Sequence, residues 1–139
     1  MDMRLTVIRV AGAVIGVLAL IGGLRAVYLG AAGTLGDAAA SIDPEALAIF
    51  DNHFRFFAGG MILAGVASIL GSIKIKDRPD IFQVGLEVIF VGGLARAFGF
   101  TEYGVLGPVL VPTIIEIVVP VPLIAMLKMH QKGAAAQAA

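Results

Sequence analysis

Four long apolar stretches dominate the chain, and short polar segments separate them. The stretches cover approximately residues 5–29, 53–73, 81–100 and 105–127. A helix rises about 1.5 Å per residue and needs about 20 predominantly apolar residues to cross the hydrocarbon core of a bilayer. The pattern therefore predicts an all-α fold, a four-transmembrane-helix bundle that forms a single domain over residues 1–132. The alanine-rich residues 133–139 are expected to be a disordered tail.

Composition agrees with a membrane location. The chain is 59% hydrophobic and only 14% charged, whereas a soluble domain is about half apolar and about a quarter charged. The net charge of zero gives no indication of a nucleic-acid partner. The expected partner is the lipid bilayer, and a homo-oligomer or a larger membrane complex stays open. The absence of cysteine excludes disulfides and thiolate chemistry.

The distribution of charges predicts the orientation of the bundle. Four spans place both termini and the loop at 74–80 on one side of the membrane. That side carries Arg4, Arg9, Lys74, Lys76, Arg78, Lys128 and Lys132. The two opposite loops carry only acidic charges, namely Asp37, Asp43, Glu45, Asp51 and Glu102. The positive-inside rule then makes both termini cytoplasmic, and we expect a multi-pass protein of the bacterial inner (plasma) membrane.

The start of the chain needs a separate interpretation, because a basic segment followed by an apolar run also resembles a signal peptide. The apolar run here is longer than a usual signal-peptide core. We therefore expect a span that is retained. Farther along, Asp43 suits a helix N-cap and Pro44 the first helical position. They predict a short outer-surface helix that leads into the second span or continues as part of it.

Ionisable residues interrupt the apolar stretches, and such residues are costly in a bilayer unless they have a partner or a function. Asp51 and Arg55 are four residues apart, so they share one helix face. We expect Arg96 to be the main partner of Glu116, with Arg55 as the competitor. Glu87 is expected to pair with Arg9, at a similar depth.

Prolines and small residues in the spans leave two further alternatives open. Pro120 removes the amide that would bond the carbonyl of Glu116. A midplane carboxylate beside a freed carbonyl fits either a kinked helix with a structural ion pair or an ion or proton site. The Gly12–Gly16 motif fits either packing within one bundle or homo-oligomerisation. A row of Gly60, Ala64, Ser68 and Ser72 is expected to pack as well.

A faint internal repeat links the first and third spans. Gly22-Gly-Leu-Arg25 resembles Gly92-Gly-Leu-Ala-Arg96. The two spans run in the same direction, as a duplicated hairpin would require.

One stretch also carries a family resemblance. Asp51-Asn-His-Phe54-Arg55-Phe-Phe-Ala-Gly59, followed by Gly93-Leu-Ala-Arg96 and by Glu116 with Pro120, resembles the bacterial family catalogued as domain of unknown function 4345. The resemblance implies a small four-helix integral membrane protein without an established activity. The positions that match the family pattern are Asp51, Asn52, Arg55, Arg96 and Glu116.

The sequence favours a non-enzymatic function, because no nucleophile–base pair, phosphate loop or dinucleotide motif is present. His53 has no second ligand at metal spacing, and we expect no cofactor. The first hypothesis is a structural or accessory subunit with a buried Arg/Glu cluster. The alternative is a binder or transporter of an anionic group, a lipid phosphate or organic acid, that enters from the outer side. The candidate ligand-binding residues are Arg55, Arg96, Glu116, Asp51, Asn52 and Arg25.

Overall fold

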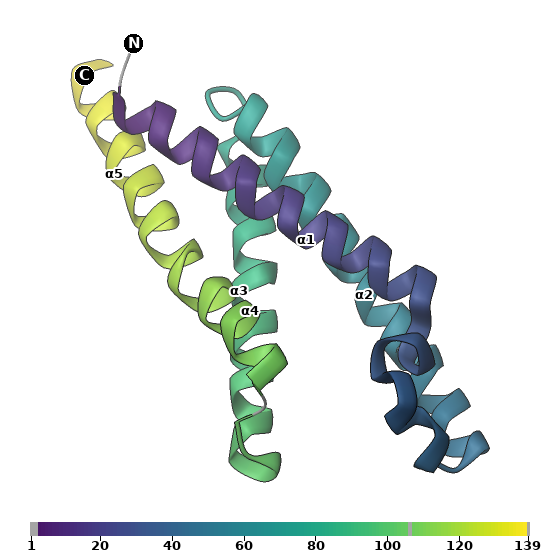
Figure 1. Cartoon of the computed structure of the whole chain (residues 1–139). Coiled ribbons are helices and arrows are strands. Elements are labelled where there is room, and N and C mark those ends of the chain that lie inside the picture. Colours follow the sequence, from purple (N-terminus) through teal and green to yellow (C-terminus); the bar gives the residue numbers. More distant parts are fainter. Residues whose placement is uncertain (1–2, 106, 139) are drawn as a thin grey trace.

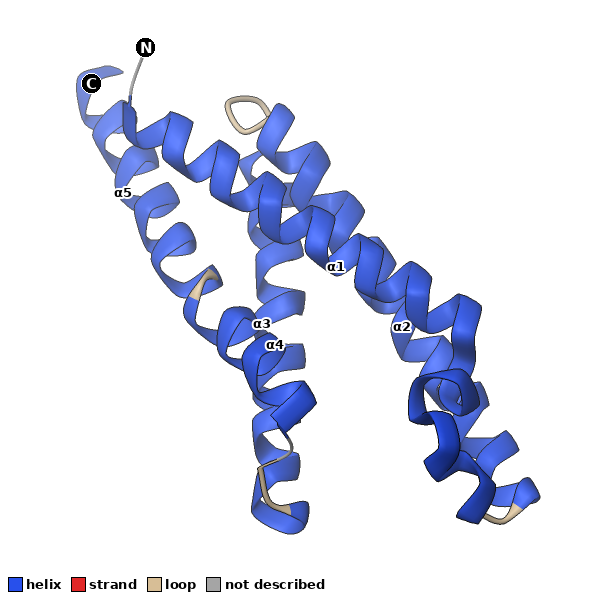
Figure 2. Ribbon diagram, in the orientation of Figure 1, coloured by secondary structure: helices blue, strands red, loops and turns tan. Residues whose placement is uncertain are grey.

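The computed structural model describes residues 3–105 and 107–138, and that part of the chain contains helices and no strand (Figure 2). Four helical segments are long and apolar enough to cross a membrane, which confirms the predicted all-α architecture with four spans. The elements are α1 (Met3–Leu35), the 3-10 helix η1 (Gly36–Ser41), α2 (Pro44–Ile73), α3 (Pro79–Tyr103), α4 (Gly107–Val118) and α5 (Pro120–Ala138).

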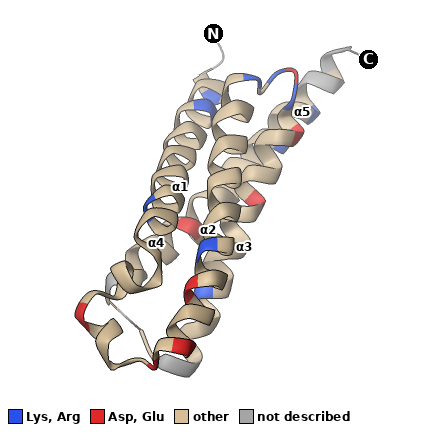
Figure 3. Cartoon of the chain, turned by 90° about the vertical axis from the view of Figure 1, so that its right-hand side faces the viewer, with Lys and Arg blue, Asp and Glu red and all other residues tan. Residues whose placement is uncertain are grey.

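The helices form two hairpins that share one end. α1 packs along α2, α3 packs on α2 and α4, and α5 returns to contact α1 and α3. Both chain ends lie at the same end of the molecule, and the α1–α2 pair diverges from the α3–α4 pair toward the opposite end (Figure 1). In the backbone view of Figure 3, Lys and Arg positions lie near the chain termini and the α2–α3 turn, and several Asp and Glu positions lie at the far end.

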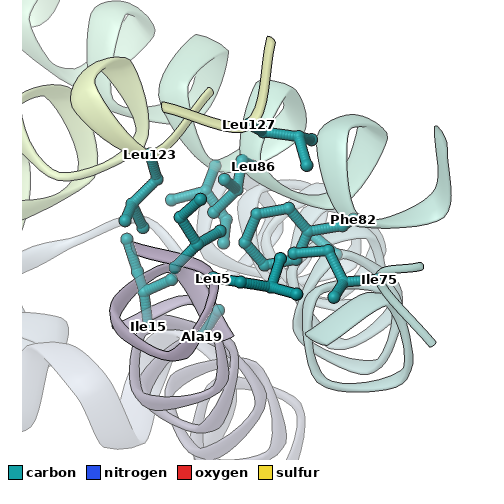
Figure 4. Packing of buried hydrophobic residues seen from close by; sticks show 11 residues of the cluster. Leu5, Ile15, Ala19, Ile75, Phe82, Leu86, Leu123 and Leu127 are labelled. Atoms are coloured by element: carbon teal, nitrogen blue, oxygen red, sulfur yellow. The ribbon is translucent and has the colours of Figure 1, made fainter. Parts of the chain in front are cut away.

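The hydrophobic core lies at the end where the termini meet. Phe82 and Leu86 of α3 are fully buried there with Ile8 of α1 and Leu127 of α5, and Figure 4 shows the interlocking side chains. Because this core joins α1, α3 and α5, it holds the two hairpins together at one end only. The other end is left more open, and the candidate site lies there.

Small residues make the helix crossings, as expected, but not all the predicted ones. Gly12 lies against the ring of Phe82, and a Cβ on Gly16 would lie 2.9 Å from the Gly65 carbonyl of α2. The motif is therefore used within the chain. Ala64, Ser68 and Ser72 are buried as predicted, but Gly60 faces open space. The predicted row does not include Gly65, although Gly65 lies on the face of α2 that packs against α1.

The start of α2 confirms the predicted cap and, of the two alternatives for the helix that follows it, confirms the one in which this helix continues as the second span. The Asp43 carboxylate accepts hydrogen bonds from the amides of Glu45 (3.1 Å) and Ala46 (3.0 Å). The predicted short outer-surface helix before the second span is not a separate element, since α2 runs without a break from Pro44 to Ile73. The preceding chain forms η1 instead. No proline follows Pro44 within α2, and nothing else there stops the helix.

The fourth span is broken, as the prolines suggest. α4 ends at Val118 and α5 begins at Pro120, which has no amide to continue the ladder. α5 then remains helical to Ala138, through the stretch predicted to be a disordered tail. Alanine has the highest helix propensity of all residues, which explains the continuation. The side chains of Glu102, Tyr103 and Pro108 lie outside the described ones.

Arg9 has a different partner from the one predicted. Its Nε donates to the carbonyl oxygen of Ser72 (3.0 Å) and its Nη2 to that of Ile73 (3.2 Å). These carbonyls belong to the last turn of α2, where backbone acceptors are unpaired and carry partial negative charge. Glu87 instead accepts a hydrogen bond from Gln83 (2.6 Å). The expected Arg9–Glu87 pair is therefore wrong.

Candidate functional site

The structure divides the predicted charged cluster into two parts. Asp51 and Arg55 form an ion pair within α2, on the side that contacts α1, with 2.7 Å between Arg55 Nε and Asp51 Oδ2. Arg96 and Glu116 form a second pair between α3 and α4. Arg25 belongs to neither. The Asp51–Arg55 pair also contacts the backbone of α1, whereas the Arg96–Glu116 pair adjoins the cavities.

The Asp51–Arg55 pair lies at a break in α1. Gly30 has φ 65° and ψ −171°, values outside the helical region. In a regular helix the amide of Ala31 would donate to the carbonyl of Val27. Here the Ala31 amide donates to Asp51 Oδ1 at 2.5 Å, and Arg55 Nη1 donates to the Val27 carbonyl. The ion pair therefore replaces one broken backbone hydrogen bond of α1.

This arrangement is a structural brace, and it explains the glycine at its centre. The backbone of Gly30 occupies a region that is essentially accessible to glycine alone. A Cβ at Gly30 would also collide with the Arg55 guanidinium and the Asp51 carboxylate. Both polar groups exposed by the break have charged partners, so the contacts with α1 account for Asp51 and Arg55 without a ligand.

Gly30→Ala and Asp51→Ala should each lower the thermal stability of the protein in detergent. The alanine at position 30 costs about 1–3 kcal/mol for its backbone conformation, and loss of the Asp51 carboxylate leaves the Ala31 amide and the Arg55 charge without a partner. Asp77→Ala is the matched control, since Asp77 lies in the exposed α2–α3 turn. If the Asp51→Ala and Asp77→Ala variants melt at the same temperature, the brace is excluded.

The second pair confirms the predicted partnership of Arg96 and Glu116. Arg96 Nε lies 3.3 Å from Glu116 Oε2, and the side chains are 42% and 12% exposed. Glu116 Oε2 is buried and has no hydrogen bond within the described part of the chain. The alternative partner, Arg55, is excluded because the brace holds it. The close approach of α3 and α4 depends on Gly93, where a Cβ would lie 2.8 Å from Glu116 Cβ.

Two adjoining cavities occupy the open end between the hairpins. The deep cavity, of about 430 Å³, is lined by Ile15, Ala19, Met61, Ile89 and Glu116 among others. The mouth cavity, of about 630 Å³, is lined by Arg25, Thr34, Gly99, Phe100 and Gly104 among others. Arg96 and Phe54 line both. Each volume falls within the range of about 300–1,000 Å³ that is usual for small-molecule sites.

The mouth cavity brings together two arginines from different hairpins. Arg25 comes from α1 and Arg96 from α3. These are the arginines of the two similar Gly-Gly-Leu segments, so each copy of the repeat seen in the sequence contributes one arginine to the lining of the same cavity. Within the described residues, Arg25 makes no ion pair or hydrogen bond, and Arg96 makes only the pair with Glu116. Asn52 is exposed and lines neither cavity.

The apolar lining is what sequence reasoning missed. Phe54, Phe57 and Met61 face the deep cavity, although nothing in their spacing distinguishes them from lipid-facing residues. One signal was available for Phe54, which stands inside the segment that carries the family resemblance. In the described part of the chain no group of three or more His, Cys, Asp or Glu residues could hold a metal ion.

Comparisons with known proteins give one match. No curated protein and no solved structure matches the chain. The sequence profile of a family described as a domain of unknown function (DUF4345) matches residues 4–127. This match covers all four spans and includes both ion pairs and Arg25. The chain therefore belongs to the DUF4345 family.

Proposed function

We propose that this protein is a non-enzymatic, multi-pass protein of the bacterial inner (plasma) membrane that binds an anionic group at the mouth cavity, from the outer side. The observation that carries the proposal is that two arginines from different hairpins, Arg25 and Arg96, line one cavity. Arginine at a membrane-embedded position is costly without a partner. Two arginines that line a common cavity supply positive charge for an anion bound in it.

The charge balance of the site supports an anion as the ligand. Arg25 and Arg96 contribute two positive charges, and Glu116 contributes one carboxylate against them. The Arg96–Glu116 contact is long for a charge-assisted hydrogen bond, which usually measures about 2.7–2.9 Å. Arg96 therefore keeps donors for another acceptor. A phosphate or carboxylate is the group that the planar guanidinium binds best.

A second candidate function is a structural role, as an accessory subunit of a larger membrane complex. The brace favours it, because the contacts of Asp51 and Arg55 join α2 to the backbone of α1. The brace accounts for two of the six candidate residues, Asp51 and Arg55, and a third, Asn52, lies away from the cavities. It does not account for Arg25, Arg96 and the cavities that they line, so anion binding is preferred.

The anion proposal predicts a specific pattern of binding by arginine variants. The protein is placed in nanodiscs of zwitterionic lipid, and binding of methyl phosphate and of decyl phosphate is measured by calorimetry. Arg25→Gln and Arg96→Gln should each weaken the binding at least tenfold, whereas Arg78→Gln should leave it unchanged because Arg78 pairs with Asp80 in the exposed turn. Binding that is absent, or equal in all four proteins, would contradict the proposal.

The orientation behind the proposal has its own test. Reporter fusions after Lys76 and after Lys132 should report the cytoplasm, and a fusion after Asp37 should report the outside. The reason is the difference in basic charge between the two ends of the bundle. An outside signal at Lys76 would reverse the side from which the mouth cavity is reached.

A further inference from the structure

We propose that the ligand is a single-chain anionic amphiphile, with its anionic head between Arg25 and Arg96 and its apolar chain in the deep cavity. This inference rests on the anion binding proposed above and adds the class of ligand. Four observations support it: the continuity of the cavities, their polarity, a side opening, and a glycine that keeps their junction clear.

The two cavities form one continuous space. Gly22 and Ala26 of α1, Phe54 of α2, Arg96 of α3 and Pro112 of α4 line both of them. Arg96 therefore stands at their junction, paired with Glu116, which lines the deep cavity. If Arg96 binds an anionic head group, an apolar chain attached to that head group can extend from the mouth cavity into the deep cavity.

The polarity of the continuous space changes with depth. The mouth cavity carries Arg25 and Thr34. The deep cavity carries the Arg96–Glu116 ion pair, and the rest of its lining is apolar, with Ile15, Ala19, Met61 and Ile89 among the lining residues. Ile15 and Arg25 are ten residues apart on α1, which corresponds to about 15 Å along a helix axis. A polar end and an apolar end at this separation match a head and a chain better than they match a small, uniformly polar anion.

The deep cavity also has a lateral opening on the side of the bundle that would face lipid. Leu18, Phe57 and Val111 line it and are 53%, 68% and 61% exposed. Since these residues belong to segments that cross the membrane, the opening faces lipid. A chain can enter between the hairpins sideways while its head stays at the depth of the arginines. The size of the cavity suits one chain, since about 300–1,000 Å³ holds one small ligand.

Gly22 keeps the junction of the two cavities clear. A Cβ at Gly22 would meet no atom within 4 Å, whereas a Cβ at the next residue, Gly23, would lie 2.8 Å from Ile62 Cγ1 and 2.9 Å from the Ala58 carbonyl. Gly23 is thus needed for helix packing, but Gly22 is not. A larger side chain at Gly22 would fill ligand space without disturbing the fold.

The decisive experiment uses the absence of Trp from the chain. In the Leu18→Trp variant, a single Trp stands at the edge of the deep cavity. The probe is decyl phosphate with bromine at the middle of its chain, added to the variant in nanodiscs of zwitterionic lipid. Bromine should quench the Trp fluorescence saturably, and excess unlabelled decyl phosphate should restore it, whereas decanol should not.

Two cavity variants and one position control complete the design. Gly22→Leu should abolish the saturable quenching, and Gly60→Leu, another substitution into open space on a span, should retain it. Val10→Trp, whose native side chain is 59% exposed and lines neither cavity, reports partition into the bilayer alone. Equal quenching of Val10→Trp and Leu18→Trp would overturn the proposal.

The outcomes also separate this inference from the anion site itself. If methyl phosphate binds but Gly22→Leu leaves the quenching of Leu18→Trp unchanged, the anion site stands and the chain site is excluded. If Arg25→Gln and Arg96→Gln have no effect on either probe, the anion site is excluded as well. A ligand from the aqueous phase gains about fourfold in affinity per added methylene. A ligand that is already in the bilayer gains little, because lipid is as apolar as the cavity.

Discussion

Arg96→Leu and Glu116→Leu should each lower the free energy of unfolding in detergent by about 3 kcal/mol. Removal of one partner leaves the other charge in an apolar setting, and Glu116 is the more buried of the two. The double variant should regain part of the loss, because it leaves no unpaired charge. Thermal unfolding of the wild type, the two single variants and the double variant completes the cycle.

A matched control for this cycle is the Arg78–Asp80 pair in the exposed α2–α3 turn, whose Nη2–Oδ2 distance is 2.8 Å. Exposed ion pairs contribute about 0–1 kcal/mol, so Arg78→Leu should have a small effect. Strictly additive losses for Arg96 and Glu116 would show that the two side chains are not coupled.

The other large effect is expected at Gly65. Gly65→Ala should destabilise the α1–α2 hairpin by about 3 kcal/mol, the upper end of the usual cost of overpacking. The added Cβ would lie 2.7 Å from both the Gly16 carbonyl oxygen and the Leu20 amide nitrogen of α1. These are backbone atoms near the middle of a span, so they cannot rotate away as a side chain can.

Gly60→Ala in the same helix provides the control. A Cβ at Gly60 meets nothing within 4 Å, and alanine is the better helix former by about 1 kcal/mol. Its thermal midpoint should therefore equal or exceed that of the wild type. If Gly65→Ala melts together with Gly60→Ala, the backbone contact between α1 and α2 is not as close as described.

The brace and the cavities are linked through α1. Asp51 and Arg55 hold the backbone of α1 at Val27 and Ala31, and Arg25 lies less than one turn before Val27. The brace therefore fixes the segment that carries one wall of the mouth cavity. For this reason Asp51 and Arg55 variants should weaken ligand binding only to the extent that they loosen α1.

Sequence alone determined the architecture, because its causes are local. The length and apolarity of each stretch predict a spanning helix without any knowledge of neighbours. The Asp43 cap, the Asp51–Arg55 pair and the break at Pro120 follow from spacings of a few residues. The Arg96–Glu116 pair was also predictable, since a buried carboxylate needs a partner and few basic residues lie at its depth.

Other features depend on how the helices lie against each other, and only the tertiary structure decided them. Arg9 binds the last carbonyls of α2 rather than Glu87, because the crossing of α1 and α2 brings that helix end within reach. Gly65 rather than Gly60 contacts α1. Which glycine does so depends on how α2 is rotated about its own axis, because the rotation determines which side of α2 faces α1.

The cavities are the clearest case. Arg25, Phe54 and Arg96 come from three helices, and no spacing along the chain relates them. They meet because the core around Phe82 joins the hairpins at one end and lets them diverge at the other. Contacts between segments that are distant in the sequence determine how far the hairpins diverge. The periodicity of a single segment predicts its helix, but it does not predict the free energy of these contacts.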